Sequence, residues 1–420
     1  MRTRFWLLLG VLASAVTWFY VSSVLTPWEY YFNVGQGKVK AQMGDLYPRW
    51  VGTRGLLLYK LNPYGPEVSH EIQIGFYGHA IEQIYTPSKG TIVDEQRFAY
   101  PIYVVFLLAP TVHADFANLQ RRAVVVLALL MLANILLCLQ ILEWRLPWMA
   151  VAALILFVLA SPPIVQGLRL RQLGLVAAFL LTASVWCIRA NRLGTAGALL
   201  AFSTIKPQMV LLPLVFFLIW SMGDLRRRWN FVAGFGLTLG ALVAAGELLL
   251  PGWIGYFFAG LAAYSKYAGF PSFLGIFLGN SFGMIAGVVI VAGFLFVAWK
   301  NRKSGEQSPQ FISGLSASLL VSVIVLPLLP PFNQVLLILP VFMIVRDWDK
   351  LSRPWRAAFV AGVSLPWIMS AAFLLFPPAI NSTRQTPLFP SMAVPFLPIL
   401  FAMLLAARRS AAREVRDRES

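Results

Sequence analysis

The chain has 420 residues, of which 59% are hydrophobic and only 12% are charged, and its mean hydropathy is +0.72. Soluble domains are usually about 45–50% apolar and about 25% charged, so the composition excludes a soluble globular protein and predicts a polytopic membrane protein. The formal charge of +17 at pH 7 does not predict a nucleic-acid partner, because basic cytoplasmic loops and contacts with anionic membrane lipids explain it.

Apolar runs recur along the whole chain. Backbone polar groups must be paired inside lipid, so spanning segments are helices or closed barrels, and these runs are too long for barrel strands. We predict an all-α polytopic protein with one integral membrane domain over residues 1–420 and about twelve transmembrane helices, of which one or two short or proline-broken ones are re-entrant. The predicted spans are roughly 5–25, 98–112, 121–142, 147–162, 173–189, 195–221, 231–250, 281–299, 311–328, 332–346, 357–377 and 390–407.

Lysine and arginine clusters fall on alternate loops of this arrangement. Basic loops stay on the cytoplasmic side, so we predict cytoplasmic N- and C-termini and a basic cytoplasmic tail over 408–420. The external side then carries a long loop over 26–97, a second over 251–280 and a third around 378–389. The predicted cytoplasmic clusters lie at 2–4, 121–122, 169–171, 226–228, 300–303, 346–356 and 408–418.

No metal-binding or nucleotide-binding motif stands out. His70, His79 and His113 form no helical ligand pair, and the chain has no glycine-rich phosphate loop. Cys138 and Cys187 each lie inside an apolar run, which favours two reduced, buried thiols over a disulfide.

The first external loop contains one aspartate among aromatic residues, Asp45 in the stretch Gly44–Trp50. The following residues predict a short interfacial helix that ends at the turn Asn62–Gly65. Asp45 therefore stands at or just before a helix start. Two interpretations remain open here: an N-cap that satisfies a free backbone N–H, and a carboxylate that takes part in chemistry.

Two basic residues occupy unusual positions. Arg97 lies at the mouth of the second predicted span, where it either anchors the helix at the interface or binds an anionic headgroup. Lys206 lies within an apolar run and precedes Pro207. A charge at that depth costs at least about 2.5–3.5 kcal/mol and usually faces a wet cavity, although a snorkelling lysine with a structural partner is the alternative.

The ordered set of motifs resembles glycosyltransferase family 87, within the GT-C superfamily of membrane-embedded glycosyltransferases. The motifs are GDLYPRW, LLLYKLNPYG, RFAYPIYVVFLLAP, a glutamine at 172 after basic residues, and AGALLAFSTIKPQMVLLPL. The resemblance implies a GT-C-like helical bundle and an inverting enzyme. Such an enzyme moves a sugar, a hexose such as mannose, from a polyprenyl-phosphate carrier to a lipid or glycan hydroxyl at the outer face of a bacterial plasma membrane.

The resemblance also implies site residues. The external aspartate of the superfamily, the general base, matches Asp45, and the cations that face the donor phosphate match Arg97 and Lys206. One carboxylate with fixed cations suffices for a lipid monophosphate leaving group, so no metal and no other cofactor is expected. Asp94 or Glu95 is a candidate for a second acid.

Other candidate residues are aromatic or amide side chains. Tyr47, Tyr64 and Tyr100 are candidate walls of the sugar or acceptor site, with an interfacial aromatic belt as the alternative. Asn333 and Gln334 occupy a proline-rich turn where many family members have a histidine. The predicted spans place Gln172 near the cytoplasmic face, so either Gln172 is structural or the fourth and fifth spans are misplaced.

Two other classes of protein remain in competition: a membrane transporter or lipid flippase, and a noncatalytic subunit of an envelope complex. A transporter has little use for about 70 external residues around an aspartate, and transport sites tend to lie near the midplane on broken helices. Dispensability of Asp45 would favour the noncatalytic subunit.

Overall fold

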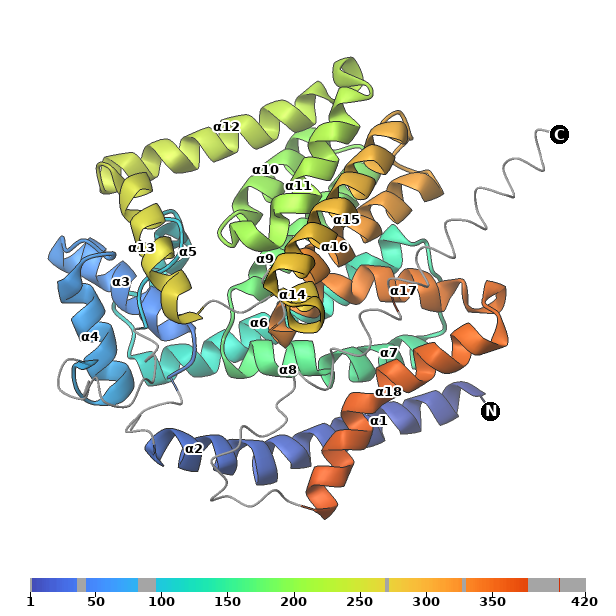
Figure 1. The fold of residues 1–420 in the computed structure, drawn as a ribbon, viewed down its shortest axis with the longest axis horizontal. Helices are drawn as coiled ribbons and strands as arrows, with labels where there is room; N and C mark the ends of the chain where they lie inside the picture. The colour runs from blue at the N-terminus through green and yellow to red at the C-terminus, as the bar shows by residue number, and fades with distance from the viewer. Residues whose placement is uncertain are drawn as a thin grey trace.

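The computed structural model describes residues 2–35, 43–81, 96–268, 272–326, 330–376 and 400. Every regular element in these residues is helical, which confirms the all-α class (Figure 1). The elements are α1 (Arg2–Tyr20), η1 (Val21–Leu25), α2 (Thr26–Gly35), α3 (Leu46–Tyr59), α4 (Pro66–Tyr77), α5 (Val104–Leu108), η5 (Ala109–Thr111), α6 (Phe116–Ile141), α7 (Trp148–Leu159), α8 (Pro162–Arg169), α9 (Gly174–Arg189), α10 (Leu193–Ser203), α11 (Pro207–Met222), α12 (Leu225–Leu249), α13 (Trp253–Ala268), α14 (Phe273–Leu278), α15 (Asn280–Lys300), α16 (Pro309–Val325), η6 (Pro331–Leu337), α17 (Ile338–Arg346), η7 (Trp348–Lys350) and α18 (Arg353–Leu375).

Several helices are long and apolar enough to cross a membrane. Within the described residues, five meet this test by length and composition: the continuous stretch Arg4–Tyr31, α6, α12, α15 and α18. The helices α7 and α8 meet it together and are bent by 59° at their junction. The protein is therefore a multi-pass membrane protein, but the count of about twelve spans is not confirmed. The expected loop around 378–389 and tail over 408–420 lie outside the described residues, as does the span 390–407 apart from residue 400.

Two predicted spans have a different structure. The segment 98–112 contains only the five-residue α5 and the three-residue η5. It is apolar because it is buried in protein: Ile102 and Val104 have no exposed surface and pack in the cluster that contains α3. The predicted span 195–221 is two helices, α10 and α11, because the α10 helix ends at Ser203 and Pro207 begins α11.

Because the segment 98–112 does not cross the bundle, the structure differs from the predicted topology in which residues lie at the same end of the bundle. At about 1.5 Å per residue, α6 is roughly 39 Å long. Its first residue, Phe116, packs on Tyr47, with ring centroids 4.8 Å apart. At its other end, Glu143 forms an ion pair with Arg189, whose guanidinium also donates to the carbonyl oxygen of Glu306.

The bundle therefore has an end that holds Asp45, here called the site end, and an opposite end. The opposite end holds residues 142–145, 189–192, 223–228 and 301–308. Arg169 pairs with Glu29 at the site end (2.7 Å), beside Leu170, whose carbonyl accepts from Asp45. The prediction that the clusters 121–122 and 169–171 lie on the side opposite Asp45 is wrong, because it counted 98–112 as a crossing.

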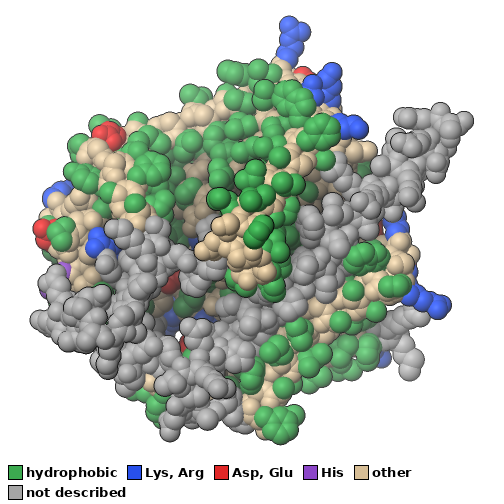
Figure 2. Space-filling model, in the orientation of Figure 1, with side chains coloured by type: hydrophobic (Ala, Val, Ile, Leu, Met, Phe, Trp, Pro, Cys, Tyr) green, Lys and Arg blue, Asp and Glu red, His purple; other side chains and the backbone are tan. Residues whose placement is uncertain are grey.

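Large apolar side chains cover the outer surfaces of α12 and α15. Leu237 and Leu248 are 76% and 87% exposed, and Phe282 is 73% exposed. Figure 2 shows hydrophobic side chains spread over this face of the molecule. An exposed apolar surface of this extent fits helices whose outer faces contact lipid.

Candidate active site

Asp45 is held in place through its backbone. It directly precedes α3, but its side chain makes no capping hydrogen bond, so the N-cap interpretation is not supported by the structure. Its amide instead donates to the carbonyl oxygen of Leu170, at 2.9 Å, in the turn between α8 and α9. Gly44 permits this approach: its φ is +63°, and a Cβ there would lie 2.8 Å from the same oxygen.

The predicted helix after Asp45 is present and is followed by the predicted turn. The turn after α3 is closed by Asn62, which accepts hydrogen bonds from the amides of Tyr64 and Gly65, both at 2.9 Å. Ten of the fourteen residues of α3 are buried, so most of this helix lies inside the protein and not on its surface. The helix is therefore a fixed support for the residues at its N-terminal end.

The carboxylate of Asp45 binds Gln172. The side-chain amide Nε2 of Gln172 donates to Oδ2 of Asp45. Gln172 is 3% exposed and lies in the turn that follows α8. In this turn, the backbone amide of Gln172 donates to the carbonyl oxygen of Gly167 at 2.8 Å. Arg171, just before it, has the left-handed φ of +51° that reverses the chain between α8 and α9. Local backbone geometry thus points Gln172 at Asp45.

Lys206 lies on the other side of the same amide. Its Nζ donates to Oε1 of Gln172 at 3.1 Å and lies 4.6 Å from the centroid of the Phe332 ring. The break between α10 and α11 presents this side chain, which is 5% exposed. Gly174 leaves room for it, since a Cβ at that position would lie 2.9 Å from Nζ.

A further contact closes these interactions into a network. The amide of Phe332 donates to Oε1 of Gln166 in α8, at 3.4 Å. The segment before α3, the turn after α8, the α10–α11 junction and η6 are thus connected around one centre. Here we call Asp45, Gln172 and Lys206 together the site triad.

Arg49 contributes a second positive charge. It lies one helical turn after Asp45, donates from Nη1 to the carbonyl oxygen of Asp45 at 2.8 Å, and stands over the Tyr100 ring at 4.7 Å. Burial raises the pKa of Asp45 above its ordinary value, while the charges of Arg49 and Lys206 oppose that shift. The centre therefore combines a carboxylate that takes up a proton more readily than usual with fixed cations.

The predicted aromatic residues pack tightly around this centre. Tyr47 lies against α4, where a Cβ on Gly75 would overlap its hydroxyl. The hydroxyl of Tyr64 donates to the carbonyl oxygen of Tyr100 at 2.6 Å. Tyr100, 5% exposed, faces Arg49. Among the three, Tyr100 is the one with a contact to a residue that binds Asp45.

The remaining predicted residues have varied positions. Arg97 is half-buried in a segment without regular secondary structure, beside Phe98, which packs on Gly52 of α3. Asn333 and Gln334 are 4% and 5% exposed, next to Phe332 in η6. Asp94 and Glu95 lie outside the described residues.

Sequence reasoning missed two members of the centre. Arg49 is four residues after Asp45, a spacing that brings side chains together on a helix, so the helix predicted after Asp45 already contained that signal. Gln172 was among the family motifs, but the predicted spans placed it near the cytoplasmic face, which left either a structural role or misplaced fourth and fifth spans. The structure places it at Asp45 because the segment 98–112 is not a span, and no local pattern shows this. In the described residues, no three His, Cys, Asp or Glu side chains gather as metal ligands would.

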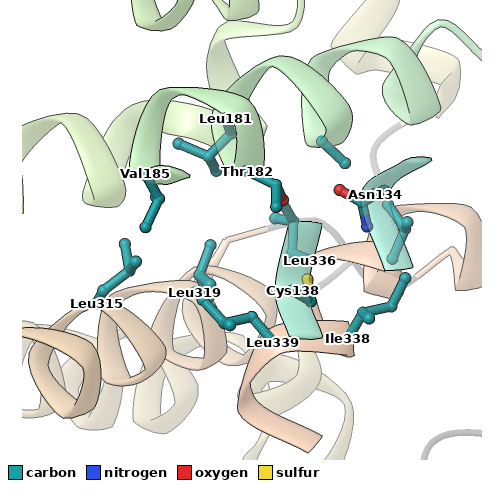
Figure 3. Close-up of a pocket in the computed structure, with 12 residues that line it drawn as sticks. Asn134, Cys138, Leu181, Thr182, Val185, Leu315, Leu319, Leu336, Ile338 and Leu339 are labelled. Carbon is teal, nitrogen blue, oxygen red and sulfur yellow. The ribbon is translucent and has the colours of Figure 1, made fainter. Parts of the chain in front are cut away.

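A cavity deep in the bundle is separate from this centre. Figure 3 shows its twelve lining residues, which come from α6, α9, α16 and the η6–α17 segment and include Asn134 and Thr182. None of them belongs to the site triad. Its walls are mainly aliphatic, so it lacks the charged groups that a phosphate-linked sugar would require.

The fold and the centre together define a membrane protein with a carboxylate and cations gathered at one end of a helical bundle. A family model, Glycosyltransferase family 87, matches residues 98–330, which is more than half of the chain. The chain belongs to this family and is a membrane glycosyltransferase. The match includes Gln172 and Lys206 but begins after Asp45. No curated protein and no solved structure matches the chain.

Proposed function

We propose that this glycosyltransferase moves a hexose such as mannose from a polyprenyl-phosphate carrier to a hydroxyl of a lipid or glycan, with Asp45 as general base. The observation that carries the proposal is the site triad, in which one amide joins a carboxylate to an ammonium group. Group transfer from a phosphate needs both: a base for the incoming hydroxyl and a cation for the departing phosphate.

The reaction is a single displacement. The acceptor oxygen attacks C1 of the donor sugar while the bond between C1 and the phosphate oxygen breaks, and the electron pair of that bond leaves with the lipid phosphate. The hydroxyl proton passes to a carboxylate oxygen of Asp45. Attack from the face opposite the phosphate inverts the configuration at C1.

The cations act on the leaving group. Lys206 and Arg97 would bind the phosphate and stabilise the charge that grows on it in the transition state. Tyr100 faces Arg49, and Asn333 and Gln334 follow Phe332 in η6. We propose that these three side chains contact the sugar or acceptor and that Tyr47 and Tyr64 support them.

The proposal includes a location. We place the site end at the external face of a bacterial plasma membrane, and the opposite end and both termini in the cytoplasm. In the described residues, the opposite end carries the basic residues Arg145, Arg192, those of the run 226–228 and those among residues 300–303. Positive loops favour the cytoplasmic side.

The test is transfer of radiolabelled sugar from polyprenyl-phosphate-mannose to a membrane-lipid extract by purified protein in nanodiscs. Asp45→Asn should lower turnover at least about 100-fold, the range expected for loss of a general base. Asp115→Asn is the matched control, because Asp115 is an exposed N-cap of α6 and asparagine caps equally well. Equal turnover by wild type and Asp45→Asn would overturn the assignment.

A chelator arm tests the need for metal. Turnover should persist in excess EDTA, because Lys206 and Arg97 are proposed to take the role that a divalent cation has for diphosphate donors. Loss of turnover in chelator and its return with Mg²⁺ or Mn²⁺ would contradict metal independence.

A further inference from the structure

Gln172 contacts both charged members of the site triad, and its orientation is fixed by chemistry. A carboxylate only accepts hydrogen bonds and an ammonium group only donates them. With Nε2 toward Asp45 and Oε1 toward Lys206, both contacts are favourable. The flipped amide would place a donor against a donor and an acceptor against an acceptor, so only one orientation is stable.

The amide separates two charges that would otherwise attract each other. A direct ion pair between Asp45 and Lys206 would use the carboxylate oxygen that must receive a proton and an N–H that must reach the phosphate. Through Gln172, each group gives up one hydrogen bond to a neutral partner. The carboxylate keeps further acceptor positions, and the ammonium group keeps further N–H donors.

The backbone that presents Gln172 is held in an unfavourable conformation. The preceding residue, Arg171, has φ +51°, where a residue with a Cβ is strained. Helices that end in this way usually have glycine at that position. This strained residue stands at the point where the turn delivers the Gln172 side-chain amide to Asp45.

We propose that Gln172 is a positioning residue that holds the Asp45 carboxylate and the Lys206 ammonium apart and in register for transfer. This inference rests on the proposed function of Asp45. The charged groups that face Asp45 are Arg49 from α3 and Lys206 from the α10–α11 junction. Gln172 contacts both Asp45 and Lys206, so its loss changes both ends of the reaction.

The decisive variant is Gln172→Met, which keeps the length of the side chain and removes both hydrogen bonds. We expect kcat to fall about 10- to 100-fold, the effect of misplacing a catalytic group, with a smaller change in the KM for the donor. The acidic limb of the pH profile should move to higher pH, because a hydrogen bond to the charged carboxylate has been lost. Gln307→Met is the matched control: Gln307 is exposed at the opposite end and bonds the carbonyl oxygen of Arg189.

A second variant separates positioning from packing. Gln172→Glu can still accept from Lys206, and it provides a polar side chain if Gln172→Met fails to fold, as judged by gel filtration and thermal unfolding. It places a second carboxylate against Asp45, so we expect lower turnover than wild type and an acidic limb at higher pH. A residue that served only as the partner of Lys206 would tolerate this change.

Wild type and Asp45→Asn are measured in the same series. If both Gln172 variants keep the turnover and pH profile of wild type while Asp45→Asn is inactive, the positioning role is overturned and the proposed function is not. Retained turnover in Asp45→Asn would overturn the proposed function itself, and the positioning role with it.

Discussion

Asp45 shows how neighbouring residues decide what a side chain can do. Burial disfavours its charged form, while Arg49 and Lys206 favour it. Gln172 binds one carboxylate oxygen, and Leu170 fixes the backbone. The same aspartate on an open helix start would be an ordinary cap.

The net direction of the pKa shift predicts a pH dependence. The pKa of Asp45 is raised by burial, and a general base acts only when deprotonated. Activity should therefore be present above the raised pKa and be lost as pH falls through it. The acidic limb of kcat/KM should lie above the ordinary aspartate pKa of about 3.9.

Lys206→Met removes a positive charge that opposes the rise in the pKa of Asp45, and it should move this limb to still higher pH. The pH dependence of kcat/KM measures both effects, and a wild-type limb at or below the ordinary value would contradict the first.

Gly44 offers a test of the backbone contact beneath Asp45. Gly44→Ala places a Cβ 2.8 Å from the carbonyl oxygen of Leu170 on a backbone with φ +63°. The strain and the clash should lower stability by about 1–3 kcal/mol and turnover by about tenfold or more, because the Asp45 segment must shift. Gly305→Ala is the control, since a Cβ there meets nothing within 4 Å. Thermal unfolding and sugar transfer check both effects; wild-type values for Gly44→Ala would show that the contact does not position Asp45.

At the scale of elements, the breaks between helices carry the residues that meet at the site. The break at Lys206–Pro207 brings a lysine to the site, and the turn between α8 and α9 brings Gln172. At the opposite end, Arg228 joins α11, α12 and the 301–308 loop. Its guanidinium lies 4.0 Å from the Trp220 ring and donates to the carbonyl oxygens of Trp220, Arg302 and Ser304.

Arg228 should therefore matter for stability more than its exposed neighbour. Arg228 is 2% exposed, and Arg228→Ala would remove its hydrogen bonds to three carbonyl oxygens and its contact with the Trp220 ring, so we expect a loss of about 3 kcal/mol. Arg227 pairs with Glu306 while its side chain is 58% exposed, and Arg227→Ala should cost less than about 1 kcal/mol. Thermal unfolding in the same detergent compares the two. Equal losses would show that the buried hydrogen bonds do not stabilise this end.

At the scale of the whole molecule, the site end and the opposite end are separated by the length of α6. His113 is exposed just before α6, at the site end, and Gly305 is exposed at the opposite end. A topology that counts 98–112 as a crossing would place both positions on one side of the membrane. The structure places them at different ends.

Cysteine labelling distinguishes the two arrangements. A membrane-impermeant maleimide added to intact cells should label His113→Cys directly, whereas Gly305→Cys should be labelled only after the membrane is opened. The native thiols do not interfere, because Cys138 and Cys187 are buried. Labelling of both variants from the same side would contradict the arrangement of the two ends.

Several properties were determined by the sequence alone. The composition requires a membrane protein, the need to pair backbone groups in lipid requires helices, and the apolar runs near α6, α12, α15 and α18 predict those helices within about six residues. The ordered motifs indicated the family that the match over residues 98–330 shows. Lys206 stood out because a charge within an apolar run is costly, and Asp45 because it is one aspartate among aromatic residues in the first predicted external loop.

The tertiary structure decided what hydropathy cannot distinguish. An apolar run such as 98–112 has the same composition whether lipid or protein surrounds it, so only packing shows that α5 is buried in the protein and does not cross. That difference moved Gln172 to the end that holds Asp45. The contacts of Gln172 join residues 127 and 34 positions apart in the chain, and no local pattern encodes such contacts because they depend on how the helices pack.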